Sequence, residues 1–301
     1  MRLRRTVLAT LPLLALTAVA CAPVDDESAS DAPSSTISEP TDAGTETEAA
    51  DACAAESLPT LEGGTLTIGT DSPAYEPWFT DNDPTNGKGY ESAIAYAVAE
   101  QLGFAEDQVS WVTVPFNTSY APGPKKFDFD INQISITPAR AEVVDFSQGY
   151  YSAAQAVIAL KGAPIADVAS IADLADYNLG AQTGTTSLTA IRDVIQPAND
   201  PAVFEDTNAA KQALLNGQVD GILADLPTAF YISAVEIPAS AIIGQFQVED
   251  GAEEEFGMLF EKGSPLVDCV NGALDALEED GSIDAIQQQW LSDVVSVPEL
   301  Q

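Results

Sequence analysis

The sequence predicts an α/β fold with largely parallel sheets. Strand-like and helix-like segments alternate from residue 65 to residue 291, which is the pattern of α/β layers. Polar or aromatic side chains also stand where several of the predicted strands end. In such sheets ligands bind beyond the carboxyl ends of the strands, so these side chains predict one common site. They are Asp71, Phe116, Ser135, Thr185 and Asp225.

The first part of this body contains three predicted strands and one helix. The strands are 65–70, 109–114 and 129–136, and the helix is 91–102, which Gly103 ends. A further extended run, 150–160, is interpreted as a crossing between two lobes.

The second part repeats the pattern. Strands are predicted at 177–181, 219–224 and 255–262, and the last of these is expected to return to the first lobe. Helices are predicted in five segments, which run from Thr185 to near Ile195, then over 206–216, 226–235, 265–279 and 282–291.

Arg140 stands in the first turn of a predicted helix. Thr137 is a good N-cap and Pro138 a good first helical residue, so the helix begins there. Cations are disfavoured at this positive end of the helix dipole. A guanidinium there indicates that an anion joins it, and its planar fork suits a carboxylate. The alternative is a surface arginine paired with Glu142 or Asp145.

Composition excludes several classes of function. The chain has 301 residues, which is enough for two domains, and 46% of them are hydrophobic. Eleven basic residues against 47 acidic ones give a net charge of −36, which argues against nucleic acid as a partner. The chain has no histidine, so histidine catalysis and histidine metal sites are excluded. No metal and no cofactor is expected.

The N-terminus predicts export. Residues 1–20 combine arginines with a short apolar run, as in a signal peptide. The run ends in Ala-Val-Ala followed by Cys21, which resembles the lipobox of bacterial lipoproteins and predicts lipidation of Cys21. The same residues also suit ordinary signal peptidase. Residues 21–60 are acidic and poor in apolar side chains, so we expect a disordered tether that leads from the lipid anchor to the folded body.

Cys53 and Cys269 remain in the exported chain. In an exported protein such a pair most often forms a disulfide, which would join the end of the tether to a late helix. Two separate thiols are the alternative.

Four segments together resemble the periplasmic amino-acid-binding proteins of ABC importers, the two-lobed Venus-flytrap family. They are GTDSPAYEPWF (69–79), SITPARAEVVDFSQGYY (135–151), GAQTGTTS (180–187) and NGQVDGILADLPTA (216–229). The resemblance covers residues 61–291. It implies a binding protein rather than an enzyme, with the ligand in a cleft between two lobes that closes around it.

The resemblance also implies roles for individual residues. Arg140 would bind the α-carboxylate of an amino acid, supported by Ser135, Thr185 and Thr186. Asp225 would bind the α-ammonium group.

Other matched positions would contact the side chain of the ligand. Tyr75 and Phe116 match aromatic positions that enclose it, although core packing is the alternative for both. Asp71 matches a position that meets the side-chain end in binders of basic amino acids and amides, or it is a turn residue. Gln133 is also placed at the site. The ligand is therefore expected to be a polar or cationic amino acid.

The resemblance further implies lobe boundaries and partners. Lobe 1 would comprise 61–153 plus 250–295, and lobe 2 would comprise 154–249. The expected partners are a membrane permease and its ATPase, and the protein is expected to be a monomer. One alternative is a cyclohexadienyl-dehydratase-like enzyme, with Glu76 or Asp71 as general acid. Another is a ligand-sensing module.

Overall fold

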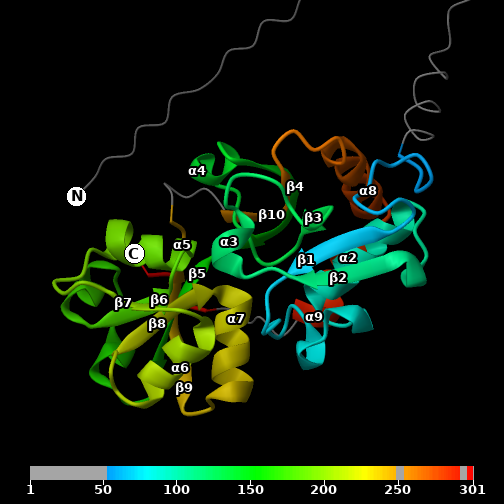
Figure 1. The fold of residues 1–301 in the computed structure, drawn as a ribbon. Helices are drawn as coiled ribbons and strands as arrows, with labels where there is room; N and C mark the ends of the chain where they lie inside the picture. Colours follow the sequence, from blue (N-terminus) through cyan, green and yellow to red (C-terminus); the bar gives the residue numbers. More distant parts are fainter. Residues whose placement is uncertain (1–52, 249–253, 292–296, 301) are drawn as a thin grey trace, which may run out of the picture. The chain divides into compact units, whose positions relative to one another are not determined.

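The computed structural model describes residues 53–248, 254–291 and 297–300. The predicted signal segment, Cys21 and most of the predicted tether lie outside these residues. Two five-stranded sheets organise the described part (Figure 1).

The first sheet has the strand order β2-β1-β3-β10-β4. Its strands β1, β2 and β3 are parallel, and β10 runs antiparallel to both β3 and β4. The strands are β1 (Leu66–Thr70), β2 (Val109–Thr113), β3 (Phe129–Asp130), β4 (Val144–Ala153) and β10 (Glu254–Glu261). The predicted return of the late strand to the first part of the body is thus confirmed.

The second sheet has the order β7-β6-β8-β5-β9. Here β6 pairs in parallel with β7 and β8, whereas β5 is antiparallel to β8 and β9. The strands are β5 (Gln155–Leu160), β6 (Leu179–Gln182), β7 (Ala202–Phe204), β8 (Gly221–Asp225) and β9 (Ser240–Phe246). Because β4 ends at Ala153 and β5 starts at Gln155, the chain passes from one sheet to the other at Ala154, within the predicted crossing.

Helices follow most of the strands, and all of them except α3 lie at segments predicted to be helical. They are α2 (Tyr90–Gln101), α3 (Phe116–Ser119), α4 (Pro138–Ala141), α5 (Thr186–Ala190), α6 (Thr207–Leu215), α7 (Leu226–Tyr231), α8 (Val267–Glu279) and α9 (Ser282–Leu291). The predicted cap is confirmed, because the side chain of Thr137 accepts a hydrogen bond from the N–H of Arg140 at 3.3 Å. The helices α5 and α7 each continue as a π-helical turn, over Ile191–Ile195 and Ile232–Glu236.

The strand predicted at 129–136 is too long, since β3 contains only Phe129 and Asp130. Gln133 has a positive φ of 47° and its N–H donates to the Glu91 carboxylate, so the chain turns instead of extending a strand. Beyond this turn Ser135 makes only an isolated bridge to Phe256.

The two sheets have separate hydrophobic cores. Trp78, Tyr90 and Phe256 are fully buried in the core of the first sheet, which α2, α8 and α9 help to form. The second sheet packs one core around Val157 and another around Ile158, two consecutive residues of β5 that point to opposite faces. Both faces of this sheet are therefore covered, as an α/β fold requires.

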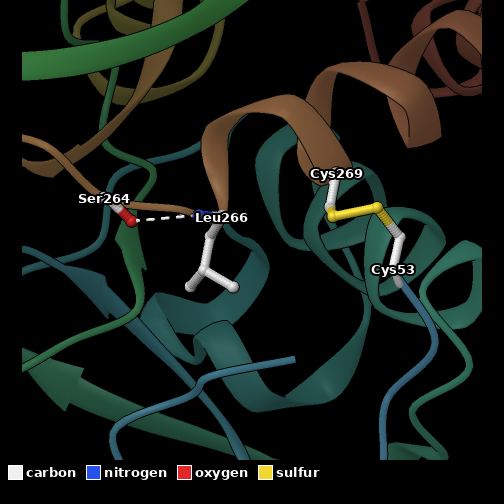
Figure 2. The surroundings of a disulfide bond; sticks show 4 residues. All are labelled: Cys53, Ser264, Leu266 and Cys269. Atoms are coloured by element: carbon white, nitrogen blue, oxygen red, sulfur yellow. Dashed lines mark hydrogen bonds between the residues drawn. A yellow bond between two sulfur atoms is a disulfide. The ribbon is translucent and has the colours of Figure 1, made fainter. Parts of the chain in front are cut away.

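The expected disulfide is present between Cys53 and Cys269, with 5.3 Å between the Cα atoms (Figure 2). Cys269 lies in the first turn of α8, just after Leu266, whose N–H bonds the Ser264 hydroxyl at 3.3 Å. The bridge therefore fixes the start of the described body onto α8 across 216 residues of sequence.

Candidate ligand-binding site

A polar cavity of about 70 Å³ lies where strands from both sheets end. All of the residues predicted for the site, except Arg140, line it. These are Asp71, Tyr75, Phe116, Gln133, Ser135, Thr185, Thr186 and Asp225. The structure thus brings together segments that are up to about 150 residues apart in the sequence, as expected for strand ends in α/β sheets.

Asp225 faces the cavity from the end of β8 and also caps α7. Its carboxylate accepts hydrogen bonds from the N–H and the hydroxyl of Thr228, both at 3.0 Å. Burial raises the pKa of Asp225 to about 6, against these two bonds, and the nearby carboxylate of Glu254 raises it further. Near neutral pH the group is therefore mostly ionised, but it is held in an unfavourable environment for a negative charge.

Asp71 lies at the end of β1. Its carboxylate accepts hydrogen bonds from the N–H groups of Ser72 at 2.6 Å and Phe116 at 3.2 Å. Burial raises the pKa of Asp71, while these hydrogen bonds oppose the rise. The carboxylate is thereby held at the cavity wall by the start of α3.

Tyr75 contributes an aromatic wall. Its hydroxyl is buried and has no hydrogen-bond partner among the described residues. Nζ of Lys211 lies 5.5 Å from the centre of its ring, but this ammonium group is paired with Glu236 at 2.6 Å. The Tyr75 hydroxyl is therefore a free polar group at the cavity.

Arg140 is buried and is not among the residues that line the cavity. Its guanidinium donates to the main-chain carbonyl of Ser135 at 2.7 Å and to that of Gly184 at 2.9 Å. It also lies over the Tyr120 ring, 4.8 Å from the centroid. Because Ser135 follows β3 and Gly184 follows β6, Arg140 links the two halves of the site.

A second contact between the two halves of the site is made by Trp78, whose indole N–H donates to the Thr228 hydroxyl at 2.8 Å. Thr228 is the residue that holds the carboxylate of Asp225. The position of Asp225 is therefore coupled to the contact between Trp78 and α7.

Gln133 is held by a buried acid that the sequence did not indicate. Glu91 is fully buried, accepts hydrogen bonds from the N–H and the side-chain amide of Gln133, and also accepts one from the Tyr150 hydroxyl. Burial raises the pKa of Glu91 to about 7, despite these three donors. Gln133 thus connects the cavity wall to the core.

The two threonines at the start of α5 differ in their hydrogen bonding. The Thr185 hydroxyl accepts from Leu188 N–H at 3.1 Å and donates to the Gln182 carbonyl at 2.8 Å, so it caps the helix. The hydroxyl of Thr186 instead bonds the carboxylate of Glu254, which also accepts from the Ser135 hydroxyl.

Glu254 is the lining residue that sequence reasoning missed. It is the first residue of β10 and comes from an acidic run, 253–255, which has the pattern of a solvated surface. Gln155, also missed, is buried and donates to the same carboxylate at 2.9 Å. Only the fold shows that the Glu254 carboxylate meets Ser135, Thr186 and Gln155.

Glu76, one of the two acids considered for catalysis, does not line the cavity. Its carboxylate accepts from the N–H of Asp81 at 3.1 Å and so belongs to a neighbouring turn. Within the described ranges no group of three potential ligands could hold a metal ion. Among those same residues no helix is long and apolar enough to cross a membrane.

Residues 66–293 match the family model for bacterial extracellular solute-binding proteins, family 3. The chain is 30% identical over 240 residues to the L-cystine-binding protein TcyA of Bacillus subtilis, covering 77% of this chain and 83% of that protein. Among solved structures it resembles an ancestral arginine-binding protein bound to arginine, with a TM-score of 0.64 at 30% identity, covering 75% of this chain and 98% of the other. It also resembles the ancestral amino-acid-binding protein AncCDT-1, a precursor of cyclohexadienyl dehydratase, with a TM-score of 0.62 at 30% identity and coverage of 75% and 95%.

The chain therefore belongs to family 3 of the bacterial extracellular solute-binding proteins, the amino-acid-binding proteins of ABC importers. The predicted fold class is confirmed: two α/β sheets are arranged as in the two-lobed periplasmic-binding-protein fold.

Proposed function

We propose that this protein captures a polar or cationic amino acid and delivers it to a membrane permease and its ATPase. One observation carries the choice of ligand class. The cavity is lined by the carboxylates of Asp71, Asp225 and Glu254, and neither lysine nor arginine is among its lining residues. Such a site attracts positive charge and repels an acidic side chain.

The α-ammonium group of the ligand would bind Asp225. This carboxylate is half-buried and forms no salt bridge among the described residues, so an ammonium group would relieve its unfavourable environment. A cationic or amide side chain would extend to Asp71 and lie against Tyr75 and Phe116. The names of the relatives support this class, because they include binders of cystine and arginine.

The α-carboxylate would bind near Arg140, Ser135 and Thr186. Two donors of the guanidinium are used by main-chain carbonyls, and an arginine has five N–H donors, so others remain for a carboxylate. Since Arg140 and Thr186 belong to different sheets, ligand contacts to both would favour the closed form.

Thermal unfolding of the detergent-solubilised full chain against the twenty amino acids tests this proposal. A ligand at 100 times its dissociation constant adds about 2.7 kcal/mol to the free energy of unfolding, which raises the melting temperature. We expect a shift with arginine, lysine or glutamine, or with cystine, which is tested in addition to the twenty. Arg140→Ala should remove the shift, whereas Arg192→Ala, at an exposed site, should retain it. The absence of a shift with every amino acid would contradict the proposal.

We further propose that Cys21 is lipidated and holds the protein on the outer face of the membrane. Export and the position of Cys21 after the signal segment support this. Cys21→Ser should move the protein from the membrane fraction to the medium. An unchanged distribution would favour a different mode of retention.

AncCDT-1 is a precursor of cyclohexadienyl dehydratase, so the alternative of an enzyme of that kind is tested directly. We expect no turnover of prephenate or arogenate by the purified protein, because Glu76 lies outside the cavity and Asp71 is held by main-chain N–H groups. Formation of product that is lost in Asp71→Asn would support the enzyme instead.

A further inference from the structure

Glu254 places a carboxylate on the donors that the proposed function assigns to the ligand. Its Oε1 accepts hydrogen bonds from the hydroxyls of Ser135 and Thr186, and its Oε2 accepts from Nε2 of Gln155 at 2.9 Å. Ser135 follows β3, Thr186 begins α5 and Gln155 begins β5, so three separate segments converge on one anion.

The donors are oriented by their own surroundings. Ser135 and Gln155 are 2% and 1% exposed. Oε1 of Gln155 accepts from the Ser187 hydroxyl at 2.6 Å, which leaves the NH₂ group of the amide to point at Glu254. Buried donors aimed at one point form a site for a carboxylate, and here the carboxylate belongs to the protein.

Glu254 forms no salt bridge within the described part of the chain, where the two salt bridges join other residues. The Arg140 guanidinium nevertheless lies near enough for this carboxylate to oppose the lowering of the pKa of Arg140 by burial. The same carboxylate lies close enough to Asp225 to disfavour its ionisation. Three neutral donors therefore hold the Glu254 carboxylate directly. Its departure would relieve the repulsion with Asp225 and leave the charge of Arg140 to a ligand carboxylate.

We propose that Glu254 is an internal competitor that occupies the carboxylate subsite of the empty protein and sets the affinity for ligands carrying an α-carboxylate. The inference rests on the proposed function. The hydroxyls of Ser135 and Thr186 each have one proton to donate, so they cannot bond Glu254 and a ligand carboxylate at the same time. A ligand with a carboxylate must displace Glu254, whereas an amine without a carboxylate leaves it in place.

Two probes with the same cationic side chain separate these cases: L-arginine and agmatine, which is arginine without its carboxylate. Affinities are measured by titration calorimetry for the full chain and for Glu254→Ala, Glu254→Gln and Glu255→Gln. Glu255 is the exposed neighbour on β10 and serves as the matched control. Where the wild type binds another amino acid, that amino acid and its decarboxylated amine replace the pair.

We expect Glu254→Ala to raise the affinity for L-arginine at least about tenfold and not to raise that for agmatine. Glu254→Gln should have a smaller effect in the same direction, because its amide still bonds the hydroxyls but has no charge. Glu255→Gln should change neither affinity. Binding of L-arginine by Glu254→Ala alone would also support the inference.

A wild-type protein that binds L-arginine as tightly as both Glu254 variants would overturn the inference and leave the proposed function intact. Weaker binding by the variants would show that Glu254 contacts the ligand directly, which also overturns it. If no amino acid binds either wild type or variant, the proposed function fails and the inference fails with it.

Discussion

Asp225 combines a structural role with the binding role that we propose for its carboxylate. It caps α7 through Thr228 and also faces the cavity. An asparagine can still accept the capping hydrogen bond but has no charge for an ammonium group. The two roles can therefore be separated by substitution.

Asp225→Asn should weaken binding of the amino-acid ligand by about 100-fold, which corresponds to the loss of about 2–3 kcal/mol for a hydrogen bond between charged groups. Its melting temperature without ligand should stay the same or rise, because a half-buried charge that forms no salt bridge among the described residues has been removed. Calorimetry and thermal unfolding measure the two effects. Asp225→Ala is the control, since it loses the cap as well and should melt at a lower temperature. Unchanged affinity in Asp225→Asn would show that the ammonium group binds elsewhere.

Affinity should also depend on pH through Asp225. The pKa of this carboxyl is about 6 in the empty protein, and only the ionised form attracts an ammonium group. As pH falls through 6 the group becomes protonated, so affinity should be constant above about pH 7 and about tenfold weaker at pH 5. Titrations over this range measure it. In Asp225→Asn the profile should be flatter, and an equally steep profile would assign the dependence to Asp71.

At the scale of elements, Gly89 shows how one residue fixes the start of a helix. It precedes α2 with a φ of 94°, and an added Cβ would lie 2.4 Å from the carbonyl oxygen of Trp78. Only glycine adopts this backbone without strain, and no side chain fits against that carbonyl. Trp78 packs on Tyr90 of α2 and bonds Thr228 at the site, so the turn connects the helix to the cavity.

Gly89→Ala should therefore destabilise the protein by several kcal/mol, about 3 or more, through strain and steric overlap. Gly272→Ala is the opposite case, because Gly272 is an exposed residue inside α8 and nothing lies within 4 Å of an added Cβ. That variant should gain about 0.5–1 kcal/mol from helix propensity. Denaturant unfolding measures the change in the free energy of unfolding for each variant. Equal changes in the two variants would contradict this account.

Elements with local signals were predictable from the sequence, and the others depended on distant contacts. The strands β1, β2 and β10 lie at segments that were predicted as strands, and the start of α4 follows from its capping residues. The short length of β3 depends on a hydrogen bond from Gln133 to Glu91, which is 42 residues away. The strand β9 was not predicted, since it includes Gly244 and its pairing with β5 is set by the fold.

The residues of the candidate site also fall into two groups, those that could be predicted from the sequence and those whose position depends on distant contacts. Residues at strand ends and in turns, such as Asp71 and Asp225, could be found because the topology of α/β sheets brings strand ends together. Glu254 could not, because an acidic run is usually a solvated surface and its position beside Thr186 depends on the return of β10 to the first sheet.

For the whole molecule, buried acids should set how stability depends on pH. Burial raises the pKa of Glu91 to about 7 and that of Asp225 to about 6, and Asp130 is shifted in the same direction with both oxygens unpartnered. Each folded-state pKa lies above its unfolded value, so the folded protein binds more protons. The free energy of unfolding is therefore highest near the unfolded pKa values and falls as pH rises through the folded ones.

The free energy of unfolding should thus decrease between about pH 4.5 and pH 7, with Glu91 alone contributing up to about 3 kcal/mol. The net charge of −36 acts in the same direction, because self-repulsion grows as carboxyls ionise. The pKa of Asp145, which Lys262 bonds, is lowered, so its stabilisation is lost only below the ordinary pKa of an aspartate and does not affect this pH range. Melting temperatures measured at intervals of half a pH unit give the slope of stability against pH.

In Glu91→Gln this slope should be shallower, whatever the absolute stability of the variant. Saturating ligand should also reduce the slope, because its ammonium group compensates the charge of Asp225. A stability that rises from pH 4.5 to pH 7 would show that these buried acids do not control the folding equilibrium.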